Sequence, residues 1–186
     1  ILQSAASPEP YDLARQIKAV LPSVPITLLA WESKLGEKDI ARQDAQIFDK
    51  VFAWQGDFRI FLAIVKYFED RLNIENDTRV VGVQSIILIE DEPRFYSSYM
   101  PVVYKEIVEH TTRLFSESVN QAQRQLRMRA RPKIVLCSTY EEAWQYFETY
   151  SSHILGIITD IEFPRLGKLD REAGFIFFKN VRALNS

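Results

Sequence analysis

The sequence predicts an α/β fold built on a parallel sheet, and two features of the 186-residue chain support this. Short apolar runs bounded by polar residues indicate strands that are buried on both faces. These runs alternate with segments whose apolar residues recur at helical spacing, an order typical of parallel strands joined by right-handed crossovers. About five strands are expected, at residues 25–31, 50–54, 85–89, 133–137 and 154–159.

Helices are expected between these strands wherever apolar residues recur every three or four positions. The expected shorter helices are residues 11–20, 36–47, 57–72, 140–150 and 173–183, with a polar linker at 73–79. Residues 94–128 contain no glycine and a single proline, Pro101, so they predict one unusually long helix or two nearly continuous ones. The spare apolar stripe of this long helix predicts packing against another helix, and hence a homodimer if that helix belongs to a second copy.

Composition excludes several classes of protein. The hydrophobic fraction of 47% and the aromatic fraction of 12% are enough for a packed core. A formal net charge of −2 provides no general attraction to nucleic acid or to an anionic membrane, and no apolar stretch reaches membrane-spanning length. The single cysteine, Cys137, excludes an internal disulfide and suits a reducing compartment, so a cytoplasmic location is expected.

Carboxylates follow two of the predicted strands at the point where each strand ends. Glu90 and Asp91 come directly after residues 85–89, and Asp160 comes directly after residues 154–159. Ligands of open α/β sheets bind at the carboxyl ends of the strands, so these side chains are expected to meet at one edge. Clustered carboxylates repel one another, and a hard cation such as Mg²⁺ is the natural partner for their oxygens.

These residues resemble the receiver domain of two-component response regulators. In residues 79–186 the pair Glu90–Asp91 matches the acidic pair of that family, and Asp160 followed by Pro164 matches its phosphoacceptor-to-proline spacing. The resemblance implies that Asp160 accepts a phosphoryl group from a histidine kinase or another donor. It also implies Mg²⁺ held by Glu90, Asp91, Asp160 and the backbone carbonyl of Glu162.

Residues 1–78 resemble the last third of a second, degenerate receiver. Ala30 stands where the family usually has a hydroxyl residue, and Trp54 stands near the position of its lysine. The two half-receivers together would supply the five strands of one flavodoxin-like sheet, ordered 2-1-3-4-5. The halves are expected to combine within one chain or, by swapping, between two copies, because each alone would leave sheet edges open.

A more specific similarity covers nearly the whole chain. Residues 50–59, 63–67, 94–98, 126–133 and 161–165 are similar to a tandem receiver-like region of some bacterial pyruvate phosphate dikinase-like proteins, where it precedes the phosphoenolpyruvate/pyruvate-binding domain. The similarity implies a regulatory module rather than an enzyme. The alternative is a phosphorylation-silent module for protein interaction or dimerisation in a larger phosphotransfer enzyme, and it depends on Ala30 and Trp54.

Overall fold

The computed structural model describes residues 10–34, 47–115 and 131–184, and it shows an α/β chain in which parallel strands alternate with helices. Backbone packing divides the chain into two units, residues 1–64 with 93–101 and residues 65–92 with 102–186. The predicted helix at 36–47 falls outside the described residues except at its last position, and so does the 116–128 part of the predicted long helix.

The first unit is built around two parallel strands. Its elements are α1 (Pro10–Val20), β1 (Thr27–Trp31), the short helix η1 (Glu32–Lys34), β2 (Lys50–Trp54) and the first turns of α3 (Pro93–Phe115). Strands β1 and β2 pair in register from Thr27 opposite Lys50 to Trp31 opposite Trp54. A small apolar core of Ala14, Ile26, Leu28 and Phe48 joins α1 to this pair.

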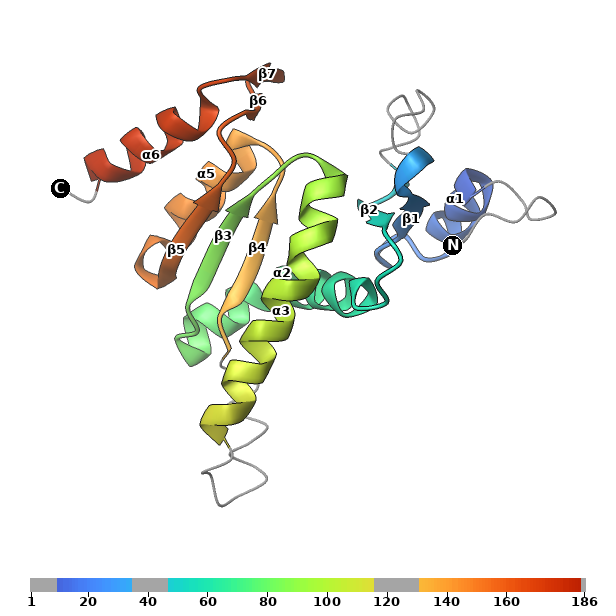
Figure 1. Ribbon diagram of the computed structural model, residues 1–186, viewed down its shortest axis with the longest axis horizontal. Coiled ribbons are helices and arrows are strands. Elements are labelled where there is room, and N and C mark those ends of the chain that lie inside the picture. The colour runs from blue at the N-terminus through green and yellow to red at the C-terminus, as the bar shows by residue number, and fades with distance from the viewer. Residues whose placement is uncertain (1–9, 35–46, 116–130, 185–186) are drawn as a thin grey trace. The chain divides into compact units, whose positions relative to one another are not determined.

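The second unit contains a three-stranded parallel sheet (Figure 1). Its elements are most of α2 (Ile60–Val81), β3 (Ser85–Ile89), the rest of α3, β4 (Lys133–Cys137), α5 (Tyr140–Tyr150), η3 (Ser151–His153), β5 (Ile154–Thr159), β6 (Phe163–Arg165), β7 (Lys168–Asp170) and α6 (Ala173–Leu184). The strand order is β4-β3-β5, with β3 in the centre. This is the order that the 2-1-3 half of the predicted sheet requires.

Helices α5 and α6 cover one face of this sheet. The core there contains alternate residues of β3 and β4 together with apolar side chains of both helices, namely Ile87, Ile89, Val135, Cys137, Ala143, Phe147, Ala173 and Phe177. All five residues of β4 are buried, as expected for a strand covered on both faces. Cys137 is buried in this core.

The prediction of one continuous five-stranded sheet is wrong for the described residues. The five parallel strands are present, but they form a two-stranded sheet and a separate three-stranded sheet. An open sheet edge benefits from a partner, but nothing about the edge requires that the other half of the same chain provide it. A small antiparallel hairpin of β6 and β7 follows β5, and no strand was expected there.

Helix α2 is longer than the sequence indicated, because the predicted polar linker at 73–79 is helical. Ile74, Asp77 and Thr78 are buried there, whereas the other residues of the stretch are exposed, so it forms part of an amphipathic helix. Residues 57–81 contain no glycine or proline, and the next residue, Gly82, adopts a φ of 72°. The Gly82 N–H donates to the Thr78 carbonyl (3.1 Å), a left-handed cap that ends the helix.

Helix α3 confirms the prediction of an unusually long helix as far as the described residues extend. It comprises 23 residues, about twice the mean helix length, and contains Pro101 in its interior. Its pairing with another helix or with a second copy stays a prediction.

Candidate functional site

The acidic residues that the sequence singled out follow the carboxyl ends of two adjacent strands. In the register of β3 with β5, Ile89 lies opposite Thr159, the last residue of each strand. The ladder continues one step further, because the Asp160 N–H donates to the Ile89 carbonyl (3.0 Å). On the other side of β3, the Glu90 N–H donates to the Cys137 carbonyl at the end of β4 (2.9 Å). The backbone positions of both acidic residues are therefore fixed by the sheet.

Glu90, Asp91 and Asp160 form one cluster, which we call the acidic triad. One oxygen from each carboxylate lies within 4.8 Å of the other two. Glu90 is buried, Asp91 is half-buried and Asp160 is exposed, so the triad opens to solvent at Asp160. The sequence predicted all three members.

Hydrogen bonds to the backbone orient two of these carboxylates. Glu90 Oε1 accepts from the N–H of Glu92 (3.0 Å), and Asp160 Oδ1 accepts from the N–H of Ile161 (2.6 Å). Asp160 Oδ2 is the oxygen that this contact leaves available. Among the described residues, no lysine or arginine forms an ion pair with Asp91 or Asp160.

The surroundings of Asp91 disfavour its ionised form. Partial burial raises the pKa of Asp91, and the negative charges of Asp160, Glu92 and Glu162 raise it further. Proximity of like charges in a partly desolvated place is the arrangement that a bound cation relieves. Carboxylate oxygens are the ligands that Mg²⁺ prefers, and the donor set of the triad therefore fits this ion.

Glu162 lies near the triad, but its side chain does not belong to it. Its charge contributes to the raised pKa of Asp91, and its carboxylate lies 3.9 Å from the guanidinium of Arg171. The role predicted for Glu162 was that of a backbone carbonyl ligand, and this stays a prediction.

Gly174 packs against the backbone of the phosphoacceptor candidate, a feature that sequence reasoning missed. Its N–H donates to the Ile161 carbonyl (3.0 Å), and a Cβ built on Gly174 would lie 2.4 Å from the carbonyl oxygen of Asp160. Only glycine therefore allows the first turn of α6 to approach this loop so closely. The available signal was the position of a glycine inside a predicted helix, where it costs about 1 kcal/mol relative to alanine.

Ala30 and Trp54 lie in the first unit, on the strands where the sequence placed them. Ala30 is the fourth residue of β1, and Trp54 is the last residue of β2. The ring of Trp54 packs against Phe61, with centroids 5.8 Å apart. Neither side chain offers a hydroxyl or an ammonium group.

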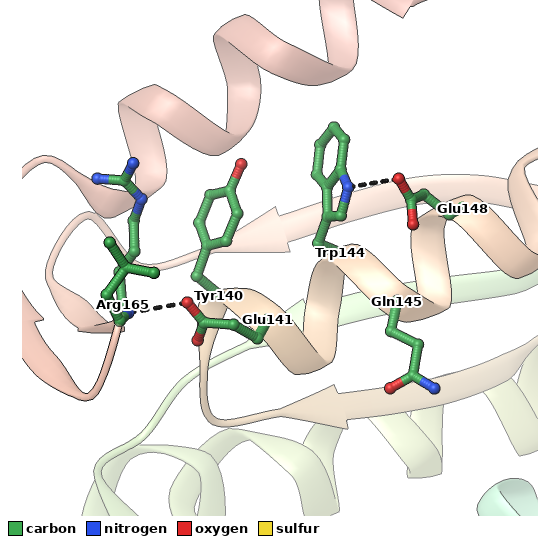
Figure 2. A pocket seen from close by; sticks show the side chains of 7 residues that line it. Tyr140, Glu141, Trp144, Gln145, Glu148 and Arg165 are labelled. Carbon is green, nitrogen blue, oxygen red and sulfur yellow. Dashed lines mark hydrogen bonds between the residues drawn. The ribbon is translucent and has the colours of Figure 1, made fainter.

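An open cavity of about 390 Å³, which we call the aromatic cavity, lies elsewhere in the second unit (Figure 2). It lies between α5 and the turn that joins β6 to β7, and its lining includes Tyr140, Glu141, Trp144, Glu148, Arg165 and Leu166. Figure 2 shows the rings of Tyr140 and Trp144 projecting side by side from α5, with Arg165 beside Tyr140. No local sequence pattern indicates this cavity.

None of the described helices is long and apolar enough to cross a membrane. Comparisons of the chain with models of protein families, with curated proteins and with solved structures found no match.

Proposed function

We propose that the second unit is a receiver-like regulatory module that accepts a phosphoryl group on Asp160 with Mg²⁺ bound beside it. The observation that carries this proposal is the convergence of the Glu90, Asp91 and Asp160 carboxylates within 4.8 Å at the ends of β3 and β5. Asp160 is the exposed member of the triad and is therefore the one that a phosphodonor could reach.

The proposed step is an in-line transfer to Asp160. Its Oδ2 would attack the phosphorus of the donor, because Oδ1 already accepts the N–H of Ile161. The new O–P bond forms as the bond between phosphorus and the leaving atom of the donor breaks, and that atom keeps the electron pair. With a phosphohistidine donor the leaving atom is a ring nitrogen, and the product on this chain is an aspartyl phosphate.

The acidic triad would hold the metal ion, with the carbonyl of Glu162 as the further ligand that the family resemblance implies. When bound, Mg²⁺ supplies positive charge that offsets the charge of the phosphoryl oxygens. The protein's own contribution is to bring the triad together and to fix the position of Asp160 through the ladder to Ile89. The module would work in the cytoplasm as a regulatory part of a phosphoenolpyruvate/pyruvate phosphotransfer enzyme.

The second candidate is a phosphorylation-silent interaction or dimerisation module. It is favoured by Ala30 and Trp54, which replace the hydroxyl residue and the lysine that a receiver uses around its phosphoryl group. Dimerisation would then use the long helix α3.

Mass spectrometry of the intact chain separates the two candidates. Incubation with acetyl phosphate and Mg²⁺ should add one phosphoryl group to the wild-type chain, and chelation of the metal should prevent this addition. Asp160→Asn should abolish it, whereas Glu75→Gln, which removes the same charge from an exposed position on α2, should leave it unchanged. A wild-type chain that binds Mg²⁺ but stays unmodified would contradict phosphoacceptance and support the silent module.

A further inference from the structure

The aromatic cavity presents negative charge next to aromatic rings. Glu141 and Glu148 line it, and among the described residues no cation forms an ion pair with either carboxylate. The only cation in the lining, Arg165, is already paired with Asp170 (3.0 Å). The cavity therefore has a negative charge that its own residues do not balance.

The rings of the cavity are held in place for contact with a flat group. Tyr140 and Trp144 lie nearly parallel, at 11° with centroids 5.9 Å apart, and Phe177 packs edge-on against both from the core. The indole N–H of Trp144 donates to Glu148 (2.7 Å), which fixes the ring and places a carboxylate at its edge. A guanidinium lying on this indole would thus also reach a carboxylate.

One of the two rings, that of Tyr140, already binds a guanidinium from the chain itself. The Arg165 side chain lies over the ring of Tyr140, 5.3 Å from its centroid. The neighbouring ring of Trp144 lies nearly parallel to that of Tyr140, and indole binds cations more strongly than phenol. Arginine suits this position better than lysine, because its planar group can stack on a ring and hydrogen-bond to a carboxylate at the same time.

The turn beside the cavity contains an unusual backbone conformation. Leu166 and Gly167 form the two-residue turn between the paired residues Arg165 and Lys168, with φ values of 53° and 73°. Such turns favour asparagine, aspartate or glycine at the first position, and a bulky residue there is strained. The Leu166 side chain is 78% exposed, so burial within this chain does not compensate for the strain. Strain of this kind at the rim of a cavity points to a contact with a ligand.

We propose that the aromatic cavity binds an arginine side chain from a peptide segment of a partner protein. The guanidinium would stack on Trp144 between the carboxylates of Glu141 and Glu148, and an apolar residue next to the arginine would contact Leu166. The cavity is preformed, because the Glu141 carboxylate accepts the N–H of Leu166 (2.8 Å) and so holds the turn against α5. Its volume of about 390 Å³ is at the small end of the ~300–1,000 Å³ typical of ligand sites, and it suits one or two side chains.

The test uses the full chain and two blocked peptides, acetyl-Gly-Leu-Arg-Leu-Gly-amide and the same peptide with citrulline, which keeps the shape of arginine without its charge. In ¹H–¹⁵N spectra the arginine peptide should shift the indole resonance of Trp144 and the amide resonance of Leu166. The citrulline peptide should bind at least tenfold more weakly. Affinity for the arginine peptide should fall with rising salt concentration, because exposed charges are screened.

Two neutralising variants test the carboxylates without removing their hydrogen bonds. In Glu141→Gln and Glu148→Gln the amide oxygen can still accept from Leu166 and from Trp144, so the cavity keeps its shape while its charge falls. Each variant should weaken binding of the arginine peptide about fivefold, and Glu75→Gln should leave the affinity unchanged.

Leu166→Asn separates binding from folding. Asparagine suits the first position of this turn, so the melting temperature should rise by about 2 °C while affinity for the arginine peptide falls. Equal affinity for the two peptides would overturn the proposal. So would an unchanged affinity of Glu148→Gln for the arginine peptide, as is expected of the control Glu75→Gln. Shifts of the Trp144 and Leu166 resonances with protein concentration alone would also overturn it, because they would assign this surface to a second copy of the chain.

Discussion

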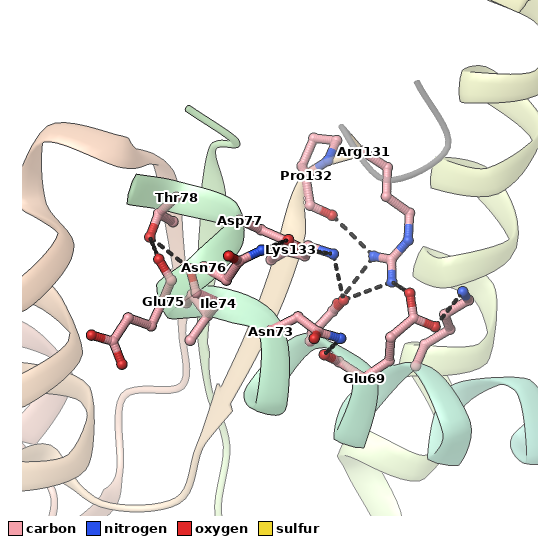
Figure 3. A network of polar contacts seen from close by, with 12 residues as sticks. Glu69, Asn73, Ile74, Glu75, Asn76, Asp77, Thr78, Arg131, Pro132 and Lys133 are labelled. Atoms are coloured by element: carbon pink, nitrogen blue, oxygen red, sulfur yellow. Dashed lines mark hydrogen bonds and ion pairs between the residues drawn. The ribbon is translucent and has the colours of Figure 1, made fainter. Parts of the chain in front are cut away.

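Two groups of acidic residues at opposite ends of the second unit's sheet differ in how their charge is balanced. Near the start of β4, Asp77 of α2 faces Lys133 (Figure 3). Asp70 of the same helix pairs with Arg131. Asp70 lies 2.6 Å from Arg131, and Asp77 lies 2.7 Å from Lys133, with both cations almost fully buried. At the other end of the sheet, the acidic triad gathers three carboxylates with no described cation paired to Asp91 or Asp160.

The negative charge of the first group is balanced by cations and hydrogen-bond donors of the chain itself. The Asp70 carboxylate is completely buried, and besides Arg131 it accepts from the hydroxyl of Tyr104 (3.1 Å) and from the N–H of Ile134 (2.9 Å). These contacts connect α2, α3 and β4, so the group serves the fold. Buried charges persist where partners satisfy them. In the triad, by contrast, backbone N–H groups contact Glu90 and Asp160, and no described lysine or arginine forms an ion pair with Asp91 or Asp160. Under the proposed function, a bound cation would supply the balancing charge of the triad.

The largest effect should follow from breaking the balanced group. Asp70→Asn removes the carboxylate that Arg131 and Lys133 share and leaves two buried cations with one fewer negative charge. The free energy of unfolding should fall by about 3–5 kcal/mol, measured by urea denaturation. Glu75→Gln, which breaks the exposed pair with Arg79, should cost less than about 0.5 kcal/mol. Similar losses in the two variants would show that burial does not distinguish these ion pairs.

An intermediate effect should follow from disturbing the backbone beneath the triad. Gly174→Ala places a methyl group where the Asp160 carbonyl lies, so the loop must shift, at a cost of about 1–3 kcal/mol. Calorimetric affinity for Mg²⁺ should fall with the stability. Gly156→Ala in β5 is the matched control, because nothing lies within 4 Å of its added carbon. Unchanged metal affinity in Gly174→Ala would mean that the close approach of α6 does not contribute to metal binding by the triad.

The smallest effect should be a gain in stability when one carboxylate of the triad, that of Asp91, is neutralised. A raised pKa means that folded Asp91 holds its proton to higher pH than the unfolded chain does, so stability falls as pH rises above the ordinary value of 3.8. The penalty is complete once folded Asp91 is ionised and is absent well below pH 3.8. In the presence of a chelator, Asp91→Asn should therefore stabilise the protein at pH 7 by less than about 1 kcal/mol.

Thermal melting with and without Mg²⁺ completes this comparison. The metal should stabilise the wild-type chain and have little effect on Asp91→Asn, because the variant lacks one of the proposed ligands. A destabilised variant in chelator, at neutral pH, would mean that Asp91 is already satisfied within the chain.

The strands and the triad were predictable because their signals are local. Each strand is a short apolar run, and the position of a carboxylate directly after a run determines which edge it occupies. Glu90, Asp91 and Asp160 therefore came from the sequence without knowledge of the intervening chain. The long helix was predictable for the same reason, since residues 94–115 lack glycine.

Features that depend on distant partners were not predictable. Residues 73–79 were interpreted as a linker because they are polar. Asp77 and Thr78 are nevertheless buried, and the local sequence pattern does not show the elements that cover them. Lys133 begins a strand, as expected. Its ion pairs with Asp70 and Asp77 were not predictable, because these partners lie on a helix far away in the sequence. The division into two sheets likewise depends on hydrogen bonds between distant strands, which apolar patterns do not specify.

The strand order also sets the time at which the acidic triad can form. Among the three strands of this sheet, the central strand β3 is synthesised first, β4 follows, and β5 comes last. Pairing between distant strands is slow because the intervening loop must first be closed. Glu90 and Asp91 leave the ribosome long before Asp160. A nascent chain therefore carries only two members of the acidic triad until β5 has been synthesised. Metal affinity would then report on whether β5 has docked, and the ion would favour the completed fold during biosynthesis.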